Sequence, residues 1–431
     1  CNILTINMED NMEKIIVRGG RKLQGEVDIS IAKNSVLPII VATILNPTEI
    51  ILKKVPMLED VTVLINLLRE LNCEVQFSSI TGDLKINTLN LKEVDPNSEL
   101  IRKMRASFLV MGPMLARFGR CKISMPGGCN IGSRPVDLHL KGFKSLGIES
   151  EIGYGYVEAK VDKLHGNRIY LDFPSVGATE NIMMAAILAP GITVIENAAE
   201  EPEIWDLARF LNSMGAKIEG AGYGKITIHG VSQLKQPEPF TPIFDRIEAG
   251  TFMVAAGITN SKITINGVNE EHLMPTIEKL KECGVYCSID GQKMIVDGTQ
   301  EKKPVDIKTM PYPGFPTDMQ AQIMALLSIT RGVSVITETV FENRFMHVGE
   351  LGRMGANIKI DGRIAIVEGV STLTGCEVKA TDLRAGAAMI LAGLVANGET
   401  EIGEVYHIDR GYTNIEEKFK KLGAEIYRIH K

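Results

Sequence analysis

The stretch IEEKFKKLGAEI, residues 415 to 426, carries the pattern from which the organisation of the whole chain follows. Ile415, Phe419 and Leu422 recur at the spacing of one helix face, with charged residues between them, which predicts an amphipathic helix. Gly423 then stands where helices commonly end in a left-handed conformation, and an alternating strand begins at Ala424. The stretch therefore predicts a helix, a glycine cap and a strand in succession.

The same step recurs along the chain at intervals of about seventy residues, which indicates an internal repeat. Its clear copies, besides the one above, are Leu146-Gly147-Ile148, Met214-Gly215-Ala216 and Met354-Gly355-Ala356. Looser copies are Leu71-Asn72-Cys73 and Cys283-Gly284-Val285. We therefore expect six repeats, each with one such helix end.

Each repeat has the same internal order. A helix that is apolar on nearly all sides comes first, as in SVLPIIVATIL (35–45), ATENIMMAAILAPG (178–191) and RAGAAMILAGLVANG (384–398). A short strand, the amphipathic helix and a strand pair follow. Because an all-apolar helix has to be buried, the repeat predicts an α/β fold whose first helices lie inside.

The sixth repeat has only one strand of its expected pair. A match for the missing strand is IIVRGGRKLQGEV (15–27), in which Gly19, Leu23 and Gly25 are spaced as in IAIVEGVSTLTGCEV (364–378). We expect this N-terminal strand to complete the sixth repeat, so that both ends of the chain belong to one domain.

The boundary between two expected domains falls in KQPEPFTPI (235–243), whose prolines are typical of a linker. The prediction is two lobes of three repeats each, one of residues 33–240 and a discontinuous one of residues 12–32 and 241–431. Small-molecule sites are common in clefts between lobes, so we expect the active site there.

Composition excludes several classes of protein. A net charge of -6 and 5% aromatic residues argue against binding to nucleic acid or to an anionic membrane. No apolar run approaches the roughly 20 residues that span a bilayer, and no signal-peptide pattern opens the chain. The seven scattered cysteines fit a reducing cytoplasm. We expect Met8 or Met12 to begin the natural protein, so residues 1–11 are left out of the fold prediction.

Neither metal nor nucleotide motifs stand out. Cys283 and Cys287 fall at a helix end and inside a strand, so no zinc site is expected. GAGYG (220–224) falls where the repeat places a hairpin turn, which disfavours a role in binding nucleotide phosphates. His139 and His407 lie in loops near the expected cleft and are candidates for supporting groups.

Polar residues gather at the starts of the apolar helices. Asn34, Asp318 and Asp382 are of the type that caps a helix, and capping alone is one explanation for them. Cations such as Lys33 and Arg384 oppose the helix dipole at that end. A bound anion or a neighbouring carboxylate explains them better, and the two explanations stay open.

Arginines recur in the loops that follow short strands. These loops are PGGCNIGSRPVDLH (126–139), TETVFENRFMHV (337–348) and VYHIDRGYTN (405–414), with Arg134, Arg344 and Arg410 respectively. Guanidinium groups pair well with phosphate and carboxylate. The loops therefore predict a small, strongly anionic ligand or set of ligands.

Taken together, the motifs resemble one family. AKN (32–34), MRAS (104–107), SVGAT (175–179), FPTDMQAQ (315–322), ATDLRA (380–385) and YHIDRGY (406–412), with the loops above, are similar to those of the UDP-N-acetylglucosamine 1-carboxyvinyltransferases. The resemblance runs from about Ile15 to the end of the chain. The sequence departs from the family pattern at Ile31, where glycine is usual, and a bulkier residue there is expected to shift the entry to the following helix.

The resemblance implies a fold, a reaction and a set of site residues. The family has an inside-out α/β barrel of two lobes and uses no cofactor. It transfers the enolpyruvyl group of phosphoenolpyruvate to the 3-hydroxyl of UDP-N-acetylglucosamine and releases phosphate. The implied catalytic residues are Cys129, Asp318, Lys33 and Arg410. The implied substrate-binding residues are Lys33, Asn34, Arg105, Arg134, Pro135, Val136, Asp137, Leu138, Phe173, Pro174, Ser175, Val176, Asp318, Val340, Asp382, Arg384 and Arg410.

Cys129 is the implied proton-transfer residue of a glycine-rich lid. A free thiol is mostly protonated at neutral pH and can act as an acid, since its reference pKa is about 8.5. Neighbouring Arg120, Lys122 and Arg134 are expected to increase its nucleophilicity. By the resemblance, this thiol is also the site that fosfomycin-type epoxides alkylate.

Two other functions stay open at this point. One is the sister reaction on shikimate 3-phosphate, although that family lacks the long cysteine-bearing loop. The other is a catalytically idle paralogue that only binds a sugar nucleotide, which Lys33, Cys129, Asp318 and Arg410 argue against. We expect a monomer, because the repeats bury their own apolar faces.

Overall fold

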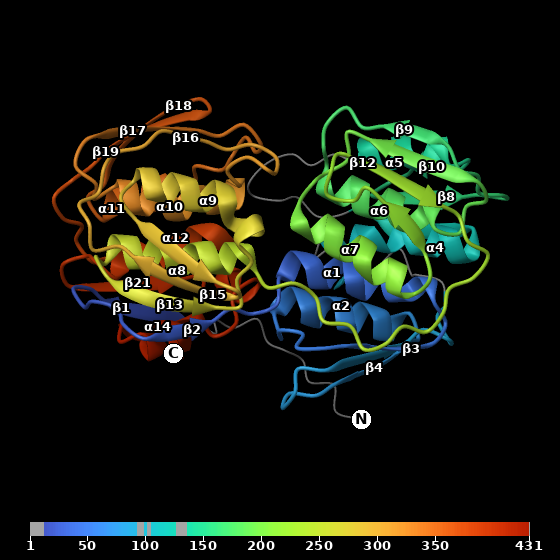
Figure 1. The fold of residues 1–431 in the computed structure, drawn as a ribbon, viewed down its shortest axis with the longest axis horizontal. Helices are drawn as coiled ribbons and strands as arrows, with labels where there is room; N and C mark the ends of the chain where they lie inside the picture. Colours follow the sequence, from blue (N-terminus) through green and yellow to red (C-terminus); the bar gives the residue numbers. More distant parts are fainter. Residues whose placement is uncertain (1–12, 93–98, 101–104, 126–135, 431) are drawn as a thin grey trace. The chain divides into compact units, whose positions relative to one another are not determined.

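The computed structural model describes residues 13–92, 99–100, 105–125 and 136–430, and only the backbone of Arg105. It divides into two compact units, which Figure 1 shows. The 30–245 unit consists of Ser30–Asp245 with Met310–Gly314. The C-terminal unit consists of Arg246–Thr309, Phe315 onward and the N-terminal residues up to Ile29. The membership of Met310–Gly314 in the 30–245 unit was not anticipated from the sequence.

In the 30–245 unit, apolar helices form the interior. They are α1 (Lys33–Ala42), α4 (Met111–Phe118) and α6 (Val176–Ala186), extended by the 3-10 turns η1 (Thr43–Leu45) and η2 (Arg105–Val110). The other helices of this unit are α2 (Glu59–Glu70), α5 (Asp137–Ser145) and α7 (Pro202–Ser213). The two sets pack together in one hydrophobic core, as their patterns predict.

The strands of this unit form three sheets, one for each successive repeat. The first sheet is β3 (Glu49–Leu52), β5 (Leu84–Asn87) and β4 (Glu74–Phe77), and the second is β6 (Arg120–Ser124), β8 (Tyr156–Lys160) and β7 (Glu149–Ile152). The third is β11 (Lys217–Glu219), β12 (Lys225–His229), β10 (Ile192–Glu196) and β9 (Arg168–Tyr170). The predicted hairpin turn at residues 220–224 is confirmed between β11 and β12.

The C-terminal unit repeats this plan. Its inner helices α8 (Arg246–Ile258), α10 (Gln320–Leu327) and α12 (Leu383–Gly393) contact one another, and Figure 1 shows sheets on either side of them. The remaining helical segments are α9 (Glu270–Glu282), η3 (Thr317–Met319), α11 (Val348–Arg353), α13 (Tyr406–Asp409) and α14 (Ile415–Lys421). Helices inside and sheets outside are the arrangement that the apolar helices predicted.

Three sheets of this unit contain four strands each. The first joins β14 (Tyr286–Asp290), β15 (Lys293–Asp297), β13 (Lys262–Asn266) and β2 (Glu26–Asp28). The second joins β16 (Ile307–Lys308), β17 (Val333–Thr337), β19 (Ile364–Glu368) and β18 (Asn357–Asp361). The third joins β20 (Glu377–Lys379), β21 (Glu399–Gly403), β1 (Lys14–Arg18) and β22 (Glu425–Ile429).

The N-terminal strand completes the sixth repeat, as predicted. β1 lies between β21 and β22 and pairs antiparallel with both, so that Ile16 is opposite Glu401 on one side and Tyr427 on the other. The prediction treated residues 15–27 as one strand, however. β2 instead pairs in parallel with β13, in the sheet of the fourth repeat.

The glycine step is confirmed at every predicted helix end. The residues in the left-handed region are Asn72, Gly147, Gly215, Gly284, Gly355 and Gly423, with φ between 67° and 94°. Asparagine is the side chain that most readily replaces glycine in this conformation, which explains the looser copy at Asn72.

Ile31 lies just before α1. Its side chain is buried, its backbone forms a bridge with Phe244, and α1 begins at Lys33. The expected effect of Ile31 on the entry to this helix stays a prediction.

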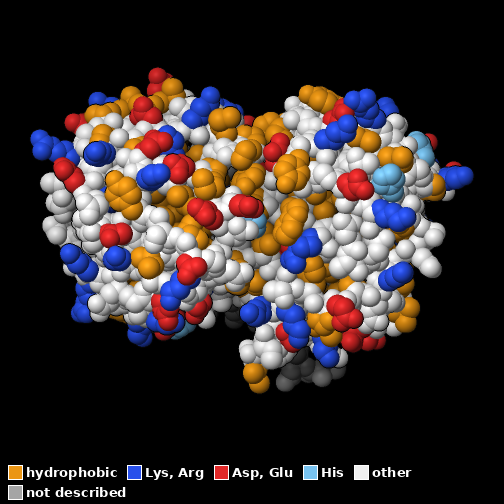
Figure 2. All heavy atoms as spheres, viewed as in Figure 1, with side chains coloured by type: hydrophobic (Ala, Val, Ile, Leu, Met, Phe, Trp, Pro, Cys, Tyr) orange, Lys and Arg blue, Asp and Glu red, His pale blue; other side chains and the backbone are white. Residues whose placement is uncertain are grey.

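The surface carries no strong bias of charge on the face drawn in Figure 2. Basic and acidic side chains are intermixed over both units. Among the helices of the described ranges, none is long and apolar enough to cross a membrane.

Candidate active site

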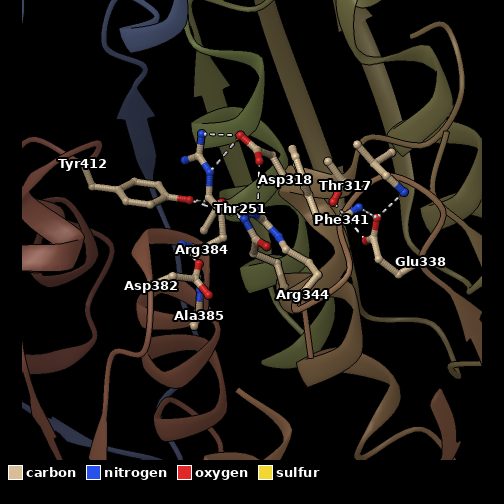
Figure 3. A network of polar contacts seen from close by, with 12 residues as sticks. Thr251, Thr317, Asp318, Glu338, Phe341, Arg344, Asp382, Arg384, Ala385 and Tyr412 are labelled. Carbon is tan, nitrogen blue, oxygen red and sulfur yellow. Dashed lines mark hydrogen bonds and ion pairs between the residues drawn. The ribbon is translucent and has the colours of Figure 1, made fainter. Parts of the chain in front are cut away.

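The carboxylate of Asp318 is held by two buried arginines in the C-terminal unit (Figure 3). Arg344 Nη2 donates to Asp318 Oδ1 over 2.8 Å, while Arg384 Nε and Nη2 donate to Oδ2 over 3.2 and 3.0 Å. The arginine side chains are 4% and 3% exposed, against 28% for that of Asp318. The guanidinium groups favour the ionised form of a carboxylate that solvent or a ligand still reaches.

Local structure explains why these groups meet. Asp318 lies in η3, directly before α10, and Arg384 lies in the first turn of α12, the neighbour of α10. Arg384 also lies over the Tyr412 ring, 5.4 Å from its centre, and Tyr412 Oη is 2.9 Å from Thr251 Oγ1 on α8. The three inner helices of this unit thus contribute to one polar network, α10 and α12 at their starts and α8 from its middle.

Asp382 has a different task from Asp318. It is the N-cap of α12, and its Oδ1 accepts the backbone N–H groups of Arg384 and Ala385 over 2.9 and 3.2 Å. The capping explanation is therefore confirmed for Asp382. For Arg384 it is the neighbouring carboxylate of Asp318 that explains a cation at a helix start.

Glu338 joins the loop of Val340 to the turn of Asp318. Its Oε1 accepts the N–H groups of Val340 and Phe341 over 2.8 and 3.1 Å, and its Oε2 accepts the Thr317 hydroxyl over 2.9 Å (Figure 3). The residue is 1% exposed. Its carboxylate thus satisfies backbone N–H groups in the loop that follows β17.

Arg410 follows α13 and is half-buried. Burial lowers the pKa of the neighbouring His407, and the positive charge of Arg410 lowers it further. Asp409, which precedes Arg410 in the sequence, accepts hydrogen bonds from Arg428 over 2.7 and 2.9 Å. Arg410 thus places a positive charge beside His407.

In the 30–245 unit, Lys33 begins α1 and forms an ion pair with Asp60. The Nζ–Oδ2 distance is 2.6 Å, and the side chains are 10% and 6% exposed. Asn34 follows and is half-buried. A neighbouring carboxylate thus explains a cation at the start of this buried helix, as for Arg384.

The remaining candidates of this unit lie on α5 and α6, which pack against each other. Val136 precedes α5 and is buried, Asp137 is exposed and Leu138 is half-buried. Ser175 is the N-cap of α6 and accepts the N–H of Ala178. The segment of Phe173 and Pro174 leads into this cap, with Phe173 44% exposed. The structure thus brings the segments of 136–138 and 173–176 together.

Comparisons with known proteins identify the family. The family model of EPSP synthase (3-phosphoshikimate 1-carboxyvinyltransferase) matches residues 17–419. UDP-N-acetylglucosamine 1-carboxyvinyltransferase 2 of Clostridium tetani is 65% identical over 97% of this chain and 100% of its own length. The corresponding enzyme 1 of Clostridium acetobutylicum is 63% identical with the same coverage. The chain belongs to the UDP-N-acetylglucosamine 1-carboxyvinyltransferases. It is therefore a transferase.

Solved structures show that the fold is that of enolpyruvyl transferases. The enolpyruvyl transferase NikO from Streptomyces tendae has a TM-score of 0.87 at 23% identity and covers 98% of this chain and 100% of its own. EPSP synthase from Acinetobacter baumannii has a TM-score of 0.74 at 18% identity, over 97% and 100%. The fold is thus kept across the carboxyvinyltransferases although most side chains differ.

Some residues implied by membership of the carboxyvinyltransferases lie outside the described residues. They are Cys129, Arg134 and Pro135, and the side chain of Arg105. Conversely, the sequence prediction did not find Asp60 or Glu338 as partners of the site residues. Asp60 stands in the first turn of an amphipathic helix, where acidic residues are ordinary, so no local pattern marks it.

Proposed function

We propose that this chain transfers the enolpyruvyl group of phosphoenolpyruvate to the 3-hydroxyl of UDP-N-acetylglucosamine, with release of phosphate. The names of its full-length relatives, at 65% and 63% identity, support this proposal. The reaction is the first committed step of peptidoglycan synthesis, so the chain acts in cell-wall formation, with both substrates in the cytoplasm. We also propose that it acts as a monomer.

The reaction has two stages. In the first, the sugar O3 forms a bond to C2 of phosphoenolpyruvate while a proton is added at the C3 methylene, which gives a tetrahedral phosphoketal. In the second, the C3 proton leaves and the C2–O bond to phosphate breaks, which restores the double bond in the product. The site therefore needs a base for the hydroxyl, an acid at C3 and cations for the phosphate and carboxylate.

Asp318 fits the base, and its position between Arg344 and Arg384 is the observation that carries the proposal. The guanidinium groups keep it ionised and fix its direction, and its carboxylate remains partly exposed. In this mechanism Asp318 accepts the proton of the 3-hydroxyl as O3 attacks C2. Asp382 and Arg384 support it, Asp382 by fixing the start of α12.

Cys129, Lys33, Arg134 and Arg410 take the other tasks. Cys129 exchanges the proton at C3. Lys33, Arg134 and Arg410 hold the phosphate and carboxylate of phosphoenolpyruvate. An ammonium group has three N–H donors, so the ion pair of Lys33 with Asp60 is compatible with a phosphate contact. The sugar nucleotide is held by Asn34, Arg105, Arg134–Leu138, Phe173–Val176, Asp318 and Val340.

The first test is phosphate release from phosphoenolpyruvate in the presence of UDP-N-acetylglucosamine. We expect release with the wild type and a loss of roughly 1000-fold in the Cys129→Ala variant, because the proton donor at C3 is removed. Cys376→Ala is the matched control, since it removes a half-buried thiol from the other unit, and we expect full activity.

A second acceptor, shikimate 3-phosphate, distinguishes the sister reaction, after which the matching family model is named. Release that requires shikimate 3-phosphate instead of the sugar nucleotide contradicts the proposal. If the wild type binds the sugar nucleotide but releases no phosphate with either acceptor, the chain is an idle paralogue.

A further inference from the structure

Arg428 connects β22 with three other segments of the C-terminal unit. Its side chain is 17% exposed and donates to both carboxylate oxygens of Asp409, over 2.7 and 2.9 Å. It also donates to both oxygens of Glu416 on α14, over 2.8 and 3.3 Å, and to Glu13, directly before β1, over 2.9 Å. These contacts use all five N–H donors of a guanidinium group, a set that lysine does not have.

Asp409 is the last residue of α13, which is a single helical turn. A helix of 4 residues is too short to be stable by itself, so its position depends on contacts with the rest of the unit. The paired hydrogen bonds with Arg428 attach the end of this turn to β22. Because Arg410 is the next residue, its backbone is attached there as well.

The chain is also fixed on the far side of Arg410. The N–H of Tyr412 donates to the carbonyl of Ile408 over 3.0 Å. Tyr412 is 2% exposed, and its Oη lies 2.9 Å from Thr251 Oγ1 (Figure 3). Arg410 therefore stands between two anchored residues, Asp409 and Tyr412.

Such anchoring lowers the entropic cost of binding through Arg410. An arginine that binds a phosphate or a carboxylate loses rotamer freedom, and a loose segment loses backbone freedom in addition. Where the backbone is already fixed, only the side chain has to be ordered. Loosening the segment should therefore weaken the binding of the ligand of Arg410 and leave other ligands unaffected.

We propose that Arg428 is a positioning residue for phosphoenolpyruvate: by holding Asp409, it fixes the backbone from which Arg410 binds the phosphate or carboxylate of that substrate. The role of Arg410 rests on the proposed function. The fixing of its segment rests on contacts within the C-terminal unit.

Steady-state kinetics of Arg428→Lys test the proposal. Lysine keeps the positive charge but cannot pair with both oxygens of Asp409 and of Glu416 at once. We expect KM for phosphoenolpyruvate to rise roughly ten-fold, about the effect of one hydrogen bond to a charged group. We expect kcat and KM for UDP-N-acetylglucosamine to stay within about two-fold. An unchanged KM for phosphoenolpyruvate, or an equal rise of both KM values, overturns the proposal.

Arg18→Lys is the matched control. Arg18 lies on β1 in the same sheet and pairs with Glu399 on β21 and Glu425 on β22, over 2.7 and 3.0 Å. The variant thus makes the same chemical change at another arginine that joins two carboxylates, and we expect unchanged kinetics. A similar rise of KM in both variants would mean that a looser sheet, and not the lost hold on Asp409, is responsible.

Asp409→Asn separates position from charge. The variant removes a negative charge next to Arg410, which by charge alone would strengthen the binding of an anion and lower KM. Because asparagine also loses the paired hydrogen bonds with Arg428, we expect KM for phosphoenolpyruvate to rise roughly three-fold or more. A fall of this KM contradicts the positioning role.

The double variant Arg428→Lys/Asp409→Asn tests whether the two residues act through one contact. We expect its KM for phosphoenolpyruvate to be close to that of Arg428→Lys, because both changes break the same pair. Effects that multiply would mean that Arg428 acts by another route and would overturn the proposal.

Hydrogen exchange of the whole protein without substrates separates the positioning of the segment from the proposed function. We expect the backbone amides of residues 405–412 to exchange faster in Arg428→Lys than in the wild type, and those of β8 to exchange equally. Equal exchange of 405–412 in both proteins overturns the proposal. Faster exchange together with a wild type that releases no phosphate from phosphoenolpyruvate contradicts the proposed function, while Arg428 still holds the segment.

Discussion

Asp318 and Asp382 stand at the starts of neighbouring inner helices, yet their carboxylates are used differently. Asp382 accepts backbone N–H groups of its own helix, while Asp318 accepts from arginine side chains that arrive from other segments. The first arrangement defines where a helix begins, and the second holds a charge in a chosen direction. The residue type at a helix start therefore does not reveal the task, but the donors around it do.

The largest difference is expected when both residues lose their charge. Asp318→Asn removes the base and leaves Arg344 and Arg384 without their shared carboxylate, so we expect kcat/KM to fall roughly 1000-fold. The measurement is the rate of phosphate release at saturating phosphoenolpyruvate, with the concentration of UDP-N-acetylglucosamine varied. Asp382→Asn is the matched control, and we expect a loss below about ten-fold. Equal losses in the two variants would mean that the carboxylates of Asp318 and Asp382 do not differ in their tasks.

His347 extends the comparison because its pKa depends on both Asp382 and Arg344, the partner of Asp318. Burial lowers its pKa to about 4, Asp382 acts against this, and the charge of Arg344 adds to it. The folded-state pKa is below the reference value of 6.5, so on acidification the unfolded chain binds the proton first. The free energy of unfolding should therefore fall between about pH 6.5 and pH 4, by up to about 1.4 kcal/mol per pH unit.

Urea unfolding of the wild type and His347→Gln across this range measures that contribution. We expect a shallower pH dependence in the variant and no such change in His165→Gln, which alters an exposed histidine of the other unit. An identical pH dependence in wild type and His347→Gln would show that His347 titrates alike in both states.

The smallest effect is expected from the cap itself. Asp382→Ala leaves the N–H groups of Arg384 and Ala385 without their acceptor and should cost about 1 kcal/mol of unfolding free energy. Asp382→Asn should stay within about 0.5 kcal/mol, because asparagine caps a helix as well as aspartate does. Urea unfolding at neutral pH checks both. An equal loss in the Asn and Ala variants would mean that the charge of Asp382, and not its capping oxygen, stabilises the helix start.

Much of the fold was predictable because the same local sequence pattern occurs in each repeat. The left-handed residue after each outer helix, glycine in all repeats but the first, and the apolar character of the inner helices are local features, and the structure has both. The place of β1 followed from its similarity to another strand pair. The pairing of β2 with β13 did not, because a three-residue strand has too few residues to show a pattern.

The site was predictable only in part, and for a physical reason. Lys33 and Asp318 stand in recognisable motifs, but their partners Asp60 and Arg344 come from segments far along the chain. Arg428 shows the same limit. In the sequence it is one charged residue of a short strand, and only the approach of α13 and α14 shows what its guanidinium group does.

The position of β1 has a consequence for biosynthesis. Its apolar residues Ile15, Ile16 and Val17 are translated long before their partners in β21 and β22, which lie between Glu399 and Ile429. The Ser30–Asp245 segment leaves the ribosome long before those partners and can fold while β1 is still unpaired. An apolar strand with both edges open is prone to wrong pairing. Nascent chains that stall before β21 should therefore be the ones that need chaperones most.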